Sequence, residues 1–149
     1  MKKTLFILTL ALCLLAFCGC TGAVLDIDSY EWQLQSATKA NLINDSMTEL
    51  SSVAVLSARN GKLTLTDSES GAVYEGTYML TDSNSKGRDY AFTFGSFTGH
   101  GILSVTDYYG ELSVPTLSVS ISDGLTRYTL LFQANVHTRV RNVVFGALK

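Results

Sequence analysis

The chain has very few cysteines, and its three cysteines all lie near the N-terminus, at Cys13, Cys18 and Cys20. No disulfide can therefore stabilise the residues that follow, and no zinc site built on cysteine thiolates can form among them. A domain of about 130 residues without such cross-links must depend on its own hydrophobic core, and this length is sufficient for one.

Histidine and basic residues are also scarce. The two histidines, His100 and His137, lie far apart and show no spacing typical of metal ligands, so we predict no metal site. Two of the 11 basic residues lie in the first three positions, which leaves nine against 13 acidic residues, a net charge of −4. Proteins bind phosphate backbones with clustered lysine and arginine, so we predict no contact with nucleic acid.

Catalytic motifs are missing as well. The sequence has no G-x-S-x-G nucleophile elbow and no glycine-rich phosphate loop after a strand. Three carboxylate pairs would serve glycoside hydrolysis only if they converged, but each lies at a predicted strand end or turn, where acidic residues commonly aid solubility. We therefore predict no enzyme activity and no cofactor. The pairs are Asp26 with Asp28, Asp67 with Glu69, and Asp107 with Glu111.

The N-terminus has the pattern of an export signal. Lys2 and Lys3 precede an uncharged apolar run over residues 4–17, which is too short to span a membrane comfortably. The end of this run, Leu15-Ala16-Phe17-Cys18-Gly19-Cys20, resembles the lipobox of bacterial lipoproteins, in which a small residue precedes the cysteine that receives diacylglycerol. Cys20 follows Gly19, whereas Cys18 follows the bulky Phe17, so Cys20 is the predicted lipid attachment site.

This pattern predicts where the mature protein is located and how the N-terminal part of the chain divides into segments. We expect residues 1–19 to be a lipoprotein signal peptide and residues 20–29 to be a lipidated N-terminus and linker. The mature protein would be extracytoplasmic and held by its lipid at the cell membrane, or at the outer membrane if the host has one. An uncleaved anchor and plain secretion remain the alternatives.

From residue 30 onward, apolar residues recur at every second position, which is the period of a half-buried strand. Asn60-Gly61 between two such segments predicts a two-residue hairpin, and we expect residues 36–52 to form a loop with one helical turn at most. We expect a second loop at residues 95–101, and we place Pro115 at the start of a strand because proline cannot donate to a ladder. The expected strands cover residues 30–35, 53–59, 62–67, 73–81, 90–94, 102–108, 116–122 and 126–134.

About eight strands joined by short turns predict an all-β domain over residues 30–134. We expect an antiparallel up-and-down meander closed as a barrel, with a β-sandwich as the alternative. Closure would remove exposed edges from strands rich in valine, leucine, threonine and aromatic residues. Residues 135–149 would be a C-terminal tail or an extra strand.

The order of these segments resembles that of small lipocalin-like lipoproteins of Gram-positive bacteria. The resemblance implies a calycin-type barrel whose base is closed by a tryptophan near the start of the first strand, here Trp32. Lipocalin-like proteins commonly hold small apolar ligands, although the resemblance identifies no binding residue. The segments that carry it are YEWQL, NGKLTLTD, YEGTYML, DYAFTFG, GILSVTDYYG, VPTLSVSI and RYTLLFQA.

Aromatic residues fall largely on one alternating face of these strands. In a barrel of about eight strands, that face either fills the interior or lines a small ligand cavity. We therefore predict a membrane-anchored binding module for a small apolar ligand, with a structural or interaction protein without a cavity as the alternative. The sequence predicts no oligomeric state. The candidate lining residues are Trp32, Tyr74, Tyr78, Tyr90, Phe92 and Tyr128.

Overall fold

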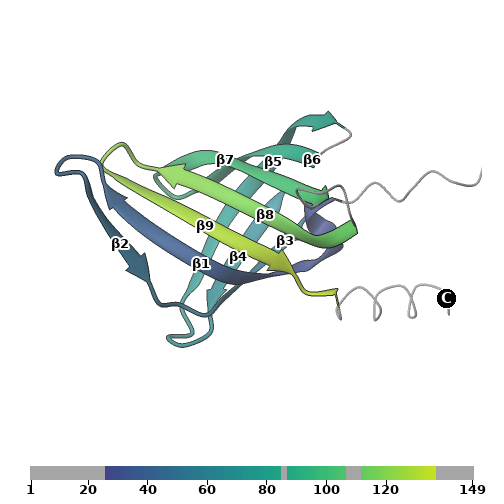
Figure 1. Cartoon of the computed structure of the whole chain (residues 1–149), viewed down its shortest axis with the longest axis horizontal. Helices are drawn as coiled ribbons and strands as arrows, with labels where there is room; N and C mark the ends of the chain where they lie inside the picture. The colour runs from purple at the N-terminus through teal and green to yellow at the C-terminus, as the bar shows by residue number, and fades with distance from the viewer. Residues whose placement is uncertain (1–25, 85–86, 107–111, 137–149) are drawn as a thin grey trace, which may run out of the picture.

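The computed structural model describes residues 26–84, 87–106 and 112–136, which form a closed barrel of antiparallel strands (Figure 1). Eight strands make the ring in the order β1-β3-β4-β5-β6-β7-β8-β9, and β9 pairs with β1 to close it. The predicted all-β barrel of about eight strands is confirmed. The elements are η1 (Ile27–Ser29), β1 (Glu31–Asn41), β2 (Ser46–Leu50), β3 (Ala54–Arg59), β4 (Lys62–Asp67), β5 (Val73–Asn84), β6 (Gly87–Phe94), β7 (Phe97–Thr106), β8 (Leu112–Ser122) and β9 (Thr126–Ala134).

The alternation of apolar residues explains why the strands curl around one core. In β3, Ala54, Leu56 and Ala58 are buried, while the residues between them are more exposed. The predicted Asn60-Gly61 turn is present: both residues have positive φ values, 51° and 79°, as a two-residue hairpin requires. The pairing of β3 with β4 consequently runs without a break to the turn.

The predicted loop over residues 36–52 is wrong, because β1 continues to Asn41 and β2 follows at Ser46–Leu50. A register shift between Leu34 and Ser36 breaks the alternation in β1. The residues beyond it pair with β9 and β2, but all of β2 is exposed. Ala37 is the only buried residue among residues 36–41 and 46–50. Backbone pairing with so little apolar burial leaves no periodic pattern in the sequence, so these strands were not predicted.

The predicted glycine-rich loop over residues 95–101 is also wrong, because β7 begins at Phe97. Its glycines allow close packing and do not mark a loop. A Cβ atom on Gly99 would lie 1.9 Å from the carbonyl oxygen of Ser120, and one on Gly101 would lie 2.4 Å from the ring of Phe92. His100 between them is an exposed strand residue.

Pro115 does not begin its strand, because β8 starts three residues earlier, at Leu112. The pairing between β7 and β8 shifts register here: Ser104 lies opposite Thr116, but Thr106 lies opposite Leu112. Pro115 falls within this irregular stretch, where its missing N–H breaks no regular ladder bond.

The barrel has two different ends. At the base lie η1, the start of β1, the β3–β4 turn and the end of β9. At the mouth lie the β1–β2 loop (residues 42–45), the β4–β5 turn (68–72), the β6–β7 turn (95–96) and the β8–β9 turn (123–125) (Figure 1). Four predictions lie outside the described residues: the signal peptide of residues 1–19, lipidation at Cys20, the Asp107 and Glu111 pair, and nearly all of the 135–149 segment.

Candidate ligand site at the barrel mouth

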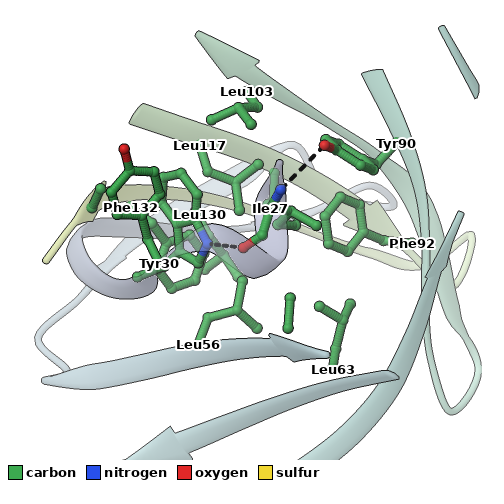
Figure 2. Packing of buried hydrophobic residues seen from close by; sticks show 14 of the residues in the cluster. Ile27, Tyr30, Leu56, Leu63, Tyr90, Phe92, Leu103, Leu117, Leu130 and Phe132 are labelled. Atoms are coloured by element: carbon green, nitrogen blue, oxygen red, sulfur yellow. Dashed lines mark hydrogen bonds between the residues drawn. The ribbon is translucent and has the colours of Figure 1, made fainter. Parts of the chain in front are cut away.

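The base of the barrel is plugged by the short helix η1, which the sequence analysis had assigned to a linker. Ile27 is fully buried in the core, where Figure 2 shows it among Tyr90, Phe92 and Leu117. The indole Nε1 of Trp32 donates a 2.7 Å hydrogen bond to the carbonyl oxygen of Ile27. Trp32 has no exposed surface, so this bond joins the first strand to the plug in the buried interior.

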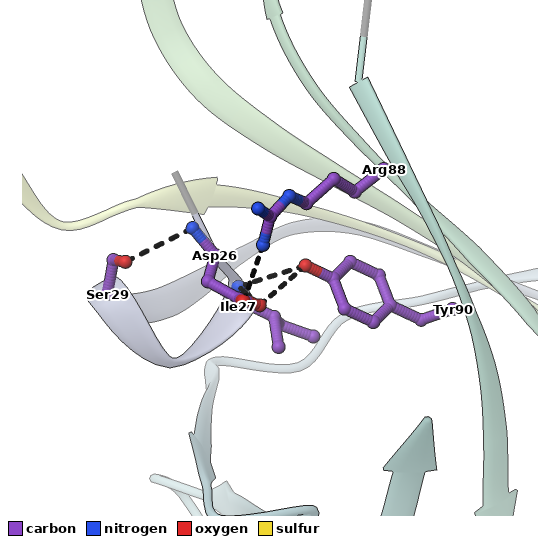
Figure 3. A network of polar contacts seen from close by, with 5 residues as sticks. All are labelled: Asp26, Ile27, Ser29, Arg88 and Tyr90. Carbon is purple, nitrogen blue, oxygen red and sulfur yellow. Dashed lines mark hydrogen bonds and ion pairs between the residues drawn. The ribbon is translucent and has the colours of Figure 1, made fainter. Parts of the chain in front are cut away.

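A polar network fastens the plug to β6 (Figure 3). One carboxylate oxygen of Asp26 accepts from the Tyr90 hydroxyl and from the Ile27 N–H, each at 2.7 Å. The other oxygen pairs with the Arg88 guanidinium. The Tyr90 hydroxyl also accepts from the Ile27 N–H at 3.2 Å, and the Ser29 hydroxyl accepts from the Asp26 N–H. These bonds satisfy the polar groups that close the base.

The network moves the pKa values of its members in directions that favour the observed pairing. Burial raises the pKa of Tyr90 to about 12, and its hydrogen bond to Asp26 acts in the same sense. Burial alone would raise the pKa of Asp26, but hydrogen bonds from Tyr90 and Ile27, together with the charge of Arg88, hold it below its usual value. Asp26 is therefore a carboxylate at neutral pH, and Tyr90 remains a donor.

At the opposite end, an open cavity of about 760 Å³ leads into the barrel from the mouth. Its volume lies in the range typical of small-molecule sites. Five polar residues stand among the lining side chains: Ser51, Ser52, Asp67, Glu75 and Ser96. The apolar lining includes Leu34, Leu50, Leu65, Tyr74, Phe94, Phe97, Ile121, Tyr128, Leu130 and Phe132.

Two of the six predicted lining residues, Tyr74 and Tyr128, do line this cavity. Trp32, Tyr90 and Phe92 are instead buried in the core nearer the base, at 0%, 0% and 1% exposure. Tyr78 is partly buried and packs edge-on against Tyr90, with ring centroids 5.9 Å apart. The part of the aromatic face near the base therefore fills the interior, and only the part near the mouth is open to a ligand.

Most of the apolar wall lies outside the six predicted residues. The period of two could have predicted Leu65 and Phe94 as lining residues. Each lies two residues beyond a buried residue of its strand, Leu63 and Phe92 respectively. Phe97 was not predicted as a lining residue, because its segment was expected to be a loop. Its ring now packs edge-on against Tyr128 with centroids 5.4 Å apart.

Among the predicted carboxylate pairs, Asp67 and Asp26 have structural roles. Asp67 accepts from the backbone N–H groups of Glu69 and Ser70, which closes the β4–β5 turn and lowers the pKa of Asp67. Asp26 belongs to the base network. No group of three histidine, cysteine, aspartate or glutamate side chains that could hold a metal ion gathers in the part of the chain that the structure describes.

A scan against protein-family models finds no match to this chain, and searches of curated proteins and of solved structures find none either. The eight-stranded antiparallel barrel is compatible with a lipocalin-like fold. Within residues 26–84, 87–106 and 112–136, none of the helices has the length and apolar character needed to cross a membrane.

Proposed function

We propose that this protein is an extracytoplasmic lipoprotein that binds a small apolar molecule in the mouth of its barrel. The observation that carries the proposal is the apolar cavity of about 760 Å³, which opens at one end above a filled and plugged base. Such a cavity lowers the free energy of an apolar ligand by removing its surface from water.

Phe97 is well placed to test the cavity. It is partly buried in the lining, at the first position of β7, whereas the next residue, Thr98, is exposed and lies outside the lining. Neighbouring strand residues point to opposite faces, so lysine at these two positions adds the same charge inside and outside the barrel. Thr98→Lys is thus a matched control for Phe97→Lys.

The measurement is the fluorescence of N-phenyl-1-naphthylamine, an uncharged dye that brightens in apolar surroundings. We expect saturable binding to the wild-type protein and to Thr98→Lys. In Phe97→Lys, loss of the aromatic wall and an ammonium in the lining should weaken binding by about tenfold or more. Unchanged emission of Trp32, the single tryptophan, would show that the variants keep their core. Absence of saturable binding to the wild type, or equal weakening in both variants, would contradict the proposal.

The proposed address comes from the sequence of the N-terminus. The short apolar run after Lys2 and Lys3 supports export, and Gly19-Cys20 supports lipid attachment at Cys20. In the proposed protein, the membrane is the partner of the N-terminal lipid, and the barrel needs no cofactor.

A second candidate function is that of a surface interaction protein, and the exposed β2 favours it. All five residues of β2 are exposed, including Met47 at 73%, and β1 is the only strand of the described residues that pairs with it. An open strand edge with apolar side chains is suited to contact with another protein. Saturable dye binding that depends on Phe97 would favour the ligand-binding function over this one.

A further inference from the structure

We infer that the mouth of the barrel faces away from the membrane that holds the protein, so that the cavity takes its apolar ligand from the aqueous side. This inference rests on the proposed membrane attachment at Cys20. It concerns the direction from which the ligand arrives, which neither the fold nor the lining residues define alone.

The attached end of the chain enters the barrel at its base. Asp26 is the first described residue, and it lies beside η1 at the end opposite the cavity (Figures 1 and 3). Its carboxylate is held by Tyr90 and Arg88 of β6, and Ile27 next to it is fully buried. This point of entry is therefore fixed to the body of the barrel.

The connection to the lipid is shorter than the barrel is tall. Cys20 precedes Asp26 by six residues, and a fully extended chain of that length reaches about 20 Å. The 11 residues of β1 run about 36 Å from base to mouth, and at the usual strand tilt they give a barrel about 25–30 Å tall.

These lengths decide the orientation. To turn its mouth onto its own membrane, the barrel would have to raise its base by its full height. The connection from Asp26 back to the lipid at Cys20 is too short for that. The base must therefore stay within about 20 Å of the bilayer, and the mouth cannot be turned directly onto it.

The mouth carries an apolar rim, which we define as Leu42, Ile43, Met47 and Leu125. All four are exposed, Ile43 at 76% and Leu125 at 58%, and the Leu42 N–H donates to the Leu125 carbonyl oxygen at 2.8 Å. An apolar rim is typical of a surface that meets a membrane or an apolar partner. In the inferred orientation it cannot reach its own bilayer, and it first contacts apolar molecules that arrive through water.

The test uses energy transfer from tryptophan to a dansyl-labelled lipid. The full gene is expressed in a bacterium, and the membrane-bound product is purified and inserted into preformed phosphatidylcholine vesicles that carry this lipid. A tryptophan is added at the mouth by Ser96→Trp or at the base by Lys62→Trp, two exposed positions, and Trp32 is kept as a common reference. The wild-type protein, with Trp32 alone, gives the baseline.

We expect the transfer added by Lys62→Trp to exceed that added by Ser96→Trp by about twofold or more, because nearly the whole barrel height separates the two positions. Equal transfer, or greater transfer from Ser96→Trp, in a protein that floats with the vesicles would overturn the orientation and leave the anchoring intact. A protein that does not float with the vesicles would overturn the anchoring and the orientation together. Dye binding by the cavity is measured separately, so the ligand-binding proposal stands or falls independently.

Discussion

At the scale of single residues, the base network is the most specific feature of this protein. Asp26 is a helix cap, an ion-pair partner of Arg88 and a hydrogen-bond acceptor for the buried Tyr90. The ion pair requires the carboxylate form, and the charge strengthens the hydrogen bonds of the other two roles, so the protonation state of Asp26 is coupled to the closure of the barrel.

This coupling predicts a dependence of stability on pH. Because the pKa of Asp26 is lower in the folded protein than in the unfolded chain, its contribution is fully present above the unfolded value of about 3.9. The contribution is lost as the pH falls through the lowered folded value. We expect Asp26→Asn to reduce the free energy of unfolding by about 1 kcal/mol at pH 7. The difference from wild type should shrink as the pH falls below about 4.

Thermal unfolding between pH 2 and pH 7 measures this difference. Asp67 and Asp123 also have pKa values lowered by backbone N–H groups in their turns, but they are present in both proteins and cancel in the comparison. Asp28→Asn is the matched control, because Asp28 on the same helix forms no ion pair among the described residues. A difference for Asp26→Asn that stays constant down to pH 2 would show that its charge does not stabilise the base.

At the scale of elements, β1 links two regions of different stability. Nearly its whole length pairs with β9, but its first half has β3 as the second neighbour, whereas Ala37–Asn41 has β2, whose side chains are all exposed. Both regions have backbone hydrogen bonds, but Ala37 is the only buried residue of the second region, and no residue of β2 packs on the core. Local stability in proteins follows such burial.

We therefore expect the amides of β2 to exchange with solvent much faster than those of β8. Opening of β2 breaks pairing with one neighbour, so its free energy should be close to zero. Opening of β8 exposes Leu117 and Val119 and should approach the global free energy of unfolding. Hydrogen exchange followed by mass spectrometry measures both segments in one experiment. Equal protection of β2 and β8 would mean that β2 is held by contacts other than its pairing with β1.

At the scale of the whole molecule, the two ends of the barrel have separate tasks. The base contains the fully buried Trp32, Tyr90 and Ile27, and it receives the chain from the proposed anchor. The mouth contains the cavity and the apolar rim. A barrel keeps these ends apart because closure of the sheet makes its wall continuous and rigid.

The proposed address is tested on the intact protein. We expect the wild-type chain, expressed in a bacterium, to be recovered with a mass that begins at an acylated Cys20. Cys20→Ala removes the thiol that would accept diacylglycerol, so it should yield no acylated product and should no longer be retained at the membrane by a lipid. Mass spectrometry of the membrane and soluble fractions measures both results. Recovery of an unmodified chain that begins at Met1 would contradict lipidation and identify residues 4–17 as an uncleaved anchor.

The sequence alone determined the fold class, because the recurrence of apolar residues at every second position is a local property of each strand. Examples are Leu56 and Ala58 in β3, and Tyr90 and Phe92 in β6. The Asn60-Gly61 hairpin followed from the positive φ values that these two residues tolerate. The export pattern around Cys20 is likewise a local pattern, and it stays a prediction of the sequence.

Only the tertiary structure decided which part of the aromatic face is open. Trp32 and Tyr74 have the same strand pattern, but one is closed off by η1 at the base and the other stands at the mouth. The base network joins Asp26 to residues more than 60 positions away, Arg88 and Tyr90. The upper part of β1 and β2 are strands because of pairing between segments and not because of an apolar period. Contacts between distant segments leave no local pattern in the sequence, so only the structure of the closed barrel shows them.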